Sequence, residues 1–328
     1  MEIKNIQDAL NVSIKQIESM DPIDRKKYYL MLRDYCESLG THSTKVTGVQ
    51  KIISKLAPNM REFDIEVRGE ENLKYDGAII LSNHSNSHDV FVDMEVFSAF
   101  QLPATYFAEK KGLSVIERKL FEGARATMID RLDKESSNIG LYDFTGKMMN
   151  GDNGIICGES TWNLHPTRPM QRIKPGATKV GAISGKPIIP EIKEYIEVPY
   201  LCEKEKDMFK KCVIVFGKPI YIRSDASLIQ QTAMLQGIME EMRRALWKEF
   251  GIKRDSLSDI NPQLYVNHTG LKVYGGKGQF DYDREKKCLS VARGEEPEFM
   301  YTIDEEGNFV PGELTRDTLN KTLQKKKY

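Results

Sequence analysis

The sequence predicts an α/β fold in which a mainly parallel, buried sheet is flanked by helices. Three observations support this fold class. Residues 1–58 show only helical periodicity, short apolar runs alternate with helix-length segments from 63 to 250, and residues 255–328 contain hairpin-like pieces among many Gly, Asp and Lys residues. We therefore divide the chain into an N-terminal helical segment at 1–60, a central α/β domain at 61–254, and a small β-rich C-terminal extension of unknown role.

The N-terminal segment is predicted to form three short amphipathic helices. Apolar residues recur there at helical spacing, and residues that cap or stop helices separate the stripes. The stripes run over 3–17, 28–39 and 46–56, and their ends are marked by Asp21, Pro22, Gly40 and Pro58. Together the helices are expected to form a small bundle or a cap on the central domain. Contact of one stripe with a membrane surface is the alternative, which the mixed charges on the polar faces disfavour.

The central domain is predicted to alternate strands and helices. Its first strand alternates apolar and polar residues, and the later ones are short continuous apolar runs, as in strands buried on both faces. The expected strands cover 63–67, 78–81, 104–108, 126–129, 154–157, 187–190 and 212–217. The expected helices cover 90–100, 135–149, 176–184 and 228–250. In the C-terminal extension, 300–310 is a hairpin-like piece.

Composition excludes several functional classes. The 328 residues contain 48 Lys or Arg and 48 Asp or Glu, so the chain lacks the basic excess of a nucleic-acid-binding protein. No apolar run approaches the ~20 residues of a membrane-spanning helix, and no signal-peptide pattern is visible. The five scattered cysteines fit free thiols in a reducing compartment. We expect a cytoplasmic protein, either soluble or peripheral on the inner membrane face.

The clearest candidate site follows the buried run at 78–81. The loop after this run reads SNHSNSHD and places His84 five residues before Asp89. The ends of buried strands are where α/β folds place their sites. If the backbone turns between the two residues, Asp89 accepts a hydrogen bond from one ring nitrogen of His84. The other nitrogen is then a general base toward a hydroxyl. The alternative is a surface loop rich in turn-forming residues, with the histidine as a capping group.

This loop and several later segments resemble the glycerolipid acyltransferase superfamily, which includes lysophosphatidic acid and glycerol-3-phosphate acyltransferases. Asn-His, four residues and then Asp after a buried strand resemble the H-x4-D motif of that superfamily. Further blocks follow in the family's order. They read AEKKGL at 108–113, ATMIDR at 126–131, GESTWN at 158–163, IKPGATKVGAISGKPIIP at 173–190 and VFGKPI at 215–220. The resemblance covers about residues 63–250.

The resemblance implies an O-acyltransferase that moves a fatty acyl group from an acyl thioester to a hydroxyl acceptor. His84 would deprotonate the acceptor hydroxyl, and Asp89 would orient His84 and stabilise its imidazolium. No metal or other cofactor is implied, because the thioester of coenzyme A or of an acyl carrier protein is already activated. Arg131 matches a family residue that contacts an acceptor phosphate. The other expected substrate-binding residues are Glu159, Ser160, Thr161, Trp162 and Lys174.

The third block departs from the family pattern Pro-Glu-Gly-Thr-Arg. Gly158, Ser160 and Trp162 stand where the family has Pro, Gly and Arg. That Arg helps to hold the acceptor's phosphate in the family, and Trp162 cannot form a charged bidentate contact. Positive charges that could replace it stand at Arg168, Arg172 and Lys174. The acceptor stays open between a lysophospholipid or glycerol phosphate and a phosphate-free sugar, polyol or lipid.

Three other interpretations are kept. CGEST at 157–161 nearly forms the nucleophile elbow of α/β-hydrolases, with Ser160 as the nucleophile, although the following Trp162 crowds the turn. A metal site would use His84, His88 and either Asp89 or Asp93. A non-catalytic scaffold that keeps the acyltransferase fold is the third, and the altered third block is its best support.

The expected partners are the acyl thioester donor and a lipid or polyol acceptor, with peripheral membrane contact and without nucleic acid. An acidic carrier protein could contact a group of basic residues, for which a solvated helix face is the simpler interpretation. These residues are Lys110, Lys111, Arg118, Lys119 and Arg125. The sequence does not determine the acyl chain length or the oligomeric state.

Overall fold

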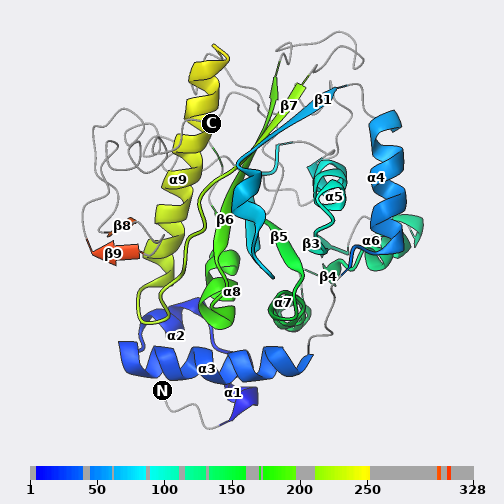
Figure 1. Ribbon diagram of the computed structural model, residues 1–328. Coiled ribbons are helices and arrows are strands. Elements are labelled where there is room, and N and C mark those ends of the chain that lie inside the picture. Colours follow the sequence, from blue (N-terminus) through cyan, green and yellow to red (C-terminus); the bar gives the residue numbers. More distant parts are fainter. Residues whose placement is uncertain are drawn as a thin grey trace.

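The fold of the chain is taken from a computed structural model, shown as a ribbon in Figure 1. The structure describes residues 5–39, 45–60, 63–85, 89–110, 115–130, 133–159, 170, 173–196, 211–251, 301–303 and 309–311. Most of the predicted C-terminal extension lies outside the described residues. No helix in the described ranges has the length and apolar character needed to cross a membrane.

A seven-stranded sheet forms the centre of the molecule, in the order β1-β7-β6-β2-β5-β3-β4. The strands are β1 (Asp64–Arg68), β2 (Ile79–Ser82), β3 (Ala104–Glu109), β4 (Thr127–Ile129), β5 (Asn153–Cys157), β6 (Ile188–Ile196) and β7 (Lys211–Phe216). The five strands from β6 to β4 are parallel to one another. β7 pairs antiparallel with β6 and parallel with β1. The predicted mainly parallel sheet is thus confirmed, with a reversed pair at one edge.

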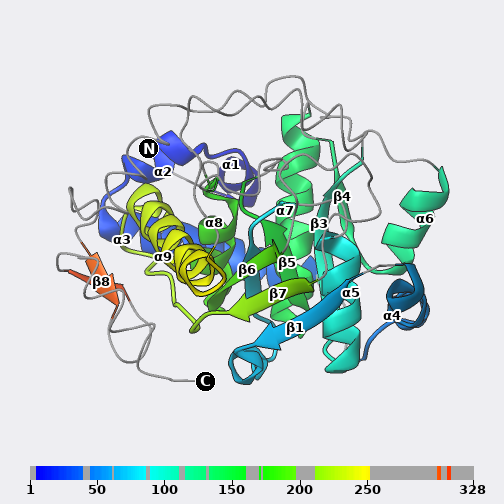
Figure 2. The ribbon, with the colours of Figure 1, turned by 90° about the horizontal axis from the view of Figure 1, so that it is seen from above.

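Helices cover both faces of this sheet, as the view from above shows (Figure 2). They are α1 (Ile6–Leu10), α2 (Ile14–Glu18), α3 (Pro22–Leu39), α4 (Gly48–Met60), α5 (Asp89–Ala99), α6 (Val115–Gly123), α7 (Lys134–Met149), α8 (Gly176–Ser184) and α9 (Leu228–Glu249), with a 3-10 helix at Glu70–Leu73. One core joins α3, α7, α8 and α9 to the face that carries Leu81 of β2. A second core joins α5 to the face that carries Ile80, and α4 packs against its edge.

The N-terminal segment differs from the predicted three helices in two places. The stripe over 3–17 was expected to be one helix, and it forms α1 and α2 instead. A capping box breaks it, because the Ser13 side chain accepts from the Gln16 amide and the Gln16 side chain accepts from the Ser13 amide. Pro58 lies inside α4 rather than ending it. Asp21 caps α3 as expected, since its Oδ1 accepts from the amides of Ile23 and Asp24.

Two further elements differ from the sequence-based expectation. Helix α6 was not predicted. β6 is five residues longer than expected from the apolar run at 187–190, because its charged residues are buried along with its apolar ones. Within the C-terminal extension, β8 (Tyr301–Ile303) and β9 (Phe309–Pro311) pair antiparallel, which confirms the hairpin predicted at 300–310. The division of the chain into three domains stays a prediction.

Candidate active site at the carboxyl end of β2

The candidate site begins where β2 ends and the backbone leaves the sheet. Asn83 follows the last residue of β2, and its side chain takes over the pairing with β6. Its Oδ1 accepts from the Lys193 amide at 2.7 Å, and its Nδ2 donates to the Lys193 carbonyl at 3.0 Å. These two bonds satisfy main-chain groups that the end of the ladder would otherwise leave unpaired. Asn83 therefore fixes the point from which His84 projects.

His84 and Asp89 meet, as the sequence predicts. The Nδ1 atom of His84 lies 2.9 Å from Oδ2 of Asp89, the first residue of α5. The same oxygen accepts from the Ser85 amide at 2.9 Å. The His84 side chain is 17% exposed and Asp89 is fully buried, so the imidazole is the partner that substrate can reach. With Nδ1 donating to the carboxylate, Nε2 is the acceptor nitrogen of the neutral ring.

The surroundings of the pair favour its charged form. Burial acts to lower the pKa of His84, but the nearby Cys157 sulfur and the hydrogen bond with Asp89 raise this pKa to about 10. Burial acts to raise the pKa of Asp89, but the hydrogen bond with His84 and the positive charge of Lys193 hold it below its ordinary value. Cys157 comes close because it pairs with Ser82 in the ladder between β5 and β2. These shifts favour an ionised Asp89 beside a protonated His84.

The end of β5 supports the loop from the other side. Oε1 of the buried Glu159 accepts from the His84 amide at 3.0 Å. The Gly158 amide donates to the Ser82 carbonyl at 2.9 Å. A Cβ atom at Gly158 would lie 2.8 Å from a methyl of Leu81 and 3.2 Å from one of Ile173, so a larger residue here would require these side chains to shift. Glu159 thus holds the backbone of the candidate base, and its expected contact with substrate stays a prediction.

A group of buried polar side chains lies behind Asp89 on the α5-facing side of β6. The Tyr195 hydroxyl donates to Oδ1 of Asp89 at 2.6 Å. Nζ of Lys193 lies 2.7 and 2.8 Å from the two carboxylate oxygens of Asp93, and 3.4 Å from Oε2 of Glu191. This group was not predicted, because the strand expected from the sequence ended at 190. The signal was the spacing of two between Glu191, Lys193 and Tyr195, which places them on one face of a strand.

Only some of the remaining predicted site residues lie in the part of the chain that the structure describes. The exposed Lys174 lies near the site through its amide, which donates to the Gly158 carbonyl at 2.9 Å. Arg131, Ser160, Thr161, Trp162 and His88 lie outside the described residues, so their roles stay predictions. Asp93, considered as a metal ligand, binds Lys193. Within the described ranges, no group of three His, Cys, Asp or Glu side chains is arranged to hold a metal ion.

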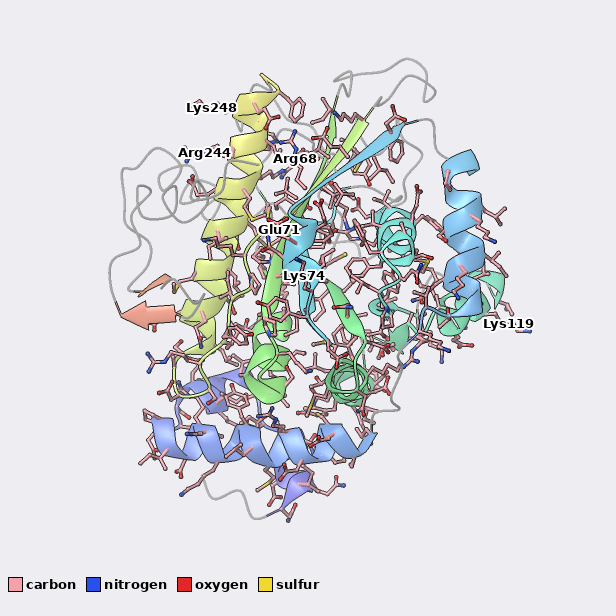
Figure 3. All side chains as sticks on the ribbon, viewed as in Figure 1. Arg68, Glu71, Lys74, Lys119, Arg244 and Lys248 are labelled. Atoms are coloured by element: carbon pink, nitrogen blue, oxygen red, sulfur yellow. The ribbon has the colours of Figure 1, made fainter. Side chains whose placement is uncertain are left out.

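The basic residues considered for a carrier protein do not form one helical face. Arg118 and Lys119 lie on α6, and Lys119 projects at the outer edge of the molecule (Figure 3). Arg125 lies beyond the end of that helix, and its guanidinium is 2.7 Å from a carboxylate oxygen of Asp152. Lys111 lies outside the described residues. A solvated face therefore describes Lys119, which is exposed, but not Arg125.

Comparison with known proteins connects this site to a reaction class. The family model described as Acyltransferase matches residues 64–192, a segment that contains His84, Asp89 and Glu159. This match confirms the predicted resemblance to acyltransferases. Among solved structures, the chain is similar to the 1-acyl-sn-glycerophosphate (LPA) acyltransferase PlsC from Thermotoga maritima. The identity is 16% and the TM-score 0.47, over 74% of this chain and 88% of that one. No curated protein matches the chain.

Proposed function

We propose that this acyltransferase moves a fatty acyl group from an acyl thioester to the hydroxyl of a lipid acceptor, with His84 as the general base. One observation carries the mechanism: the 2.9 Å contact between His84 and Asp89 at the carboxyl end of β2, inside the segment that the family model matches. The donor is coenzyme A or an acyl carrier protein carrying the acyl chain, and neither metal nor another cofactor takes part.

The proposed reaction is a direct transfer. Nε2 of His84 takes the proton of the acceptor hydroxyl while the hydroxyl oxygen attacks the thioester carbonyl carbon. The carbon–sulfur bond of the tetrahedral intermediate then breaks, and the imidazolium returns its proton to the departing thiolate. Asp89 keeps the imidazole oriented and stabilises its positive charge during both steps. Backbone amides at the start of α5 are the candidate donors to the developing oxyanion.

The proposed acceptor is a lysophospholipid or glycerol phosphate, with Arg131 contacting the phosphate and Lys174 as a nearby positive charge. A phosphate-free acceptor is the second candidate, and Trp162 at the place of the family's Arg favours it. Ser160, Thr161 and Trp162 are proposed to line the acceptor side together with Glu159. A lysophospholipid acceptor resides in membranes, so for that acceptor we propose a peripheral contact of a cytoplasmic enzyme with the inner membrane face.

The test is thiol release from palmitoyl-coenzyme A by the wild type and by His84→Ala. We expect the variant to lose about 10²- to 10⁴-fold in rate, the usual contribution of a general base. Equal far-ultraviolet circular dichroism and an unchanged thermal midpoint would show that the variant is folded. Wild-type release by a folded His84→Ala protein would contradict the proposal.

The acceptor is tested in the same assay with lysophosphatidate, glycerol 3-phosphate and monoacylglycerol. Release with a phosphate acceptor that Arg131→Ala weakens would support the phosphate-bearing acceptor. Release with monoacylglycerol alone would support the second candidate. Release without any acceptor that is lost in Ser160→Ala would instead indicate a serine hydrolase.

A further inference from the structure

Three buried residues on one face of β6 lie directly behind the candidate catalytic pair. Glu191, Lys193 and Tyr195 share the face that packs toward α5, and each is at least nine-tenths buried. β6 lies next to the central strand β2, and Figure 1 shows α5 to the right of β6. The last two residues of this set approach two carboxylates of α5, Asp89 and Asp93. The strand and the helix are therefore joined by charge and hydrogen bonds as well as by apolar packing.

The contacts on Asp89 divide between its two oxygens. Oδ2 contacts the His84 ring and the Ser85 amide, both in the loop that carries the base. Oδ1 accepts the Tyr195 hydroxyl, which comes from the sheet, at 2.6 Å. The Tyr195 ring is itself held edge-on against Phe63, with ring centroids 5.5 Å apart. A carboxylate bound at both oxygens cannot rotate freely, so the tyrosine fixes the plane in which Asp89 meets His84.

A proton on His84 reduces the excess of negative charge on this face. Asp89, Asp93 and Glu191 supply three carboxylates to the buried group, and Lys193 is the cation that contacts two of them. Burial and the charge of Glu191 raise the pKa of Asp93, so the carboxylates in the interior compete for a limited positive charge. An imidazolium at His84 supplies a second cation to the described group. The interior thus favours the charged state through which the proposed reaction passes.

We propose that Tyr195 is a positioning residue for acyl transfer, with its hydroxyl holding Asp89 in the orientation that serves His84, and that Lys193 supplies positive charge behind that carboxylate. The inference rests on the proposed role of His84 as the base. Tyr195 acts through Asp89 and contacts neither substrate. Its loss should therefore lower kcat and leave KM for both substrates unchanged.

The test is Tyr195→Phe, which removes one oxygen and keeps the ring. We expect kcat to fall about tenfold, as for one lost hydrogen bond to a charged group. Without this donor, Asp89 presents more negative charge to His84, so the pKa of His84 rises. The base works in its neutral form, so the acidic limb of the kcat/KM profile should move to higher pH.

Tyr106→Phe is the matched control. Tyr106 is a buried tyrosine of β3 whose hydroxyl has no hydrogen-bond partner among the described residues, and it faces the same charged group. We expect this variant to have the kcat of the wild type and the same acidic limb in its kcat/KM profile. Equal loss of thermal stability in the two variants, with both limbs unmoved, would show a structural role only and overturn the inference.

The two proposals fail in different ways. Wild-type thiol release that does not depend on His84 would contradict the proposed function itself. The positioning role alone would be contradicted by two results together. Thiol release would depend on His84, and Tyr195→Phe would match the wild type in kcat and in the acidic limb of its pH profile.

Discussion

Two buried lysines lie on opposite faces of the sheet, and their surroundings differ. Lys193 of β6 is fully buried and contacts two carboxylates, Asp93 and Glu191. Lys179 of α8 is 4% exposed, and its Nζ donates to the Tyr142 hydroxyl at 3.1 Å and lies 5.1 Å from the centre of that ring. Lys193 is thus surrounded by charged side chains beside the candidate catalytic pair. Lys179 lies against aromatic side chains where α3, α7 and α8 meet.

The difference indicates what each lysine does. Lys193 lowers the pKa of Asp89, so its charge acts on the residue that is proposed to orient the base. The Tyr142 hydroxyl beside Lys179 donates in turn to the carbonyl of Leu10, which ties the N-terminal helices to α7. We therefore expect changes on the α5-facing side to alter the reaction and its pH dependence. Changes on the opposite side should alter stability alone.

The largest effect is expected from Asp89→Asn. The amide has almost the same shape, but it cannot stabilise an imidazolium and can orient the wrong tautomer of His84. We expect kcat/KM to fall about 10²- to 10⁴-fold, the range of general acid–base catalysis. Thiol release at saturating acceptor measures it. A folded variant with wild-type kcat/KM would show that the α5-facing carboxylates take no part in the reaction.

The two faces of the sheet are compared directly by measuring the variants Lys193→Met and Lys179→Met. Removing Lys193 leaves buried carboxylates uncompensated, so we expect the free energy of unfolding to fall by about 3–5 kcal/mol and kcat/KM at least tenfold. Removing Lys179 breaks one charged hydrogen bond, with an expected loss of about 1.5–3 kcal/mol and no change in kcat/KM. Urea unfolding and thiol release measure the two quantities. If Lys193→Met does not fold, Asp93→Asn probes the same pair. Equal effects on activity from both faces would contradict the comparison.

The smallest effect is expected from replacing one of two cysteines that lie on opposite faces of the sheet. Cys157 raises the pKa of His84, so kcat/KM of the wild type should rise with pH well above 6.5. Cys157→Ala should lower that pKa and move the acidic limb to lower pH. Cys36, buried in α3 on the opposite face, is the control, and Cys36→Ala should leave the limb in place. The measurement is the dependence of kcat/KM on pH between pH 6 and 10. A shift of the acidic limb in both variants, or in neither, would contradict the role of Cys157 in raising the pKa of His84.

Much of the fold could be predicted because it depends on local patterns. Alternating apolar residues marked the first strand and apolar runs the other six, and caps such as Asp21 marked where helices begin. The errors arose where a local signal competes with a tertiary one. Ser13 divided an apolar stripe that was continuous in the sequence. β6 extends past Pro190 because its charged side chains are compensated inside the protein. In the sequence, the same charged residues indicate a solvent-exposed segment, so the predicted strand was too short.

Local residue patterns were enough to predict the alternation of strands and helices and the pairing of His84 with Asp89. These two residues are five apart in one loop, so a single turn of the backbone brings them together. The residues behind this pair could not be predicted in this way, because they come from a distant part of the chain. Tyr195 is 106 residues from Asp89, and Lys193 is 110 residues from Asn83. They meet because β6 lies beside β2 in the sheet. That strand order follows from the packing of whole helices and strands, which no local pattern of residues encodes.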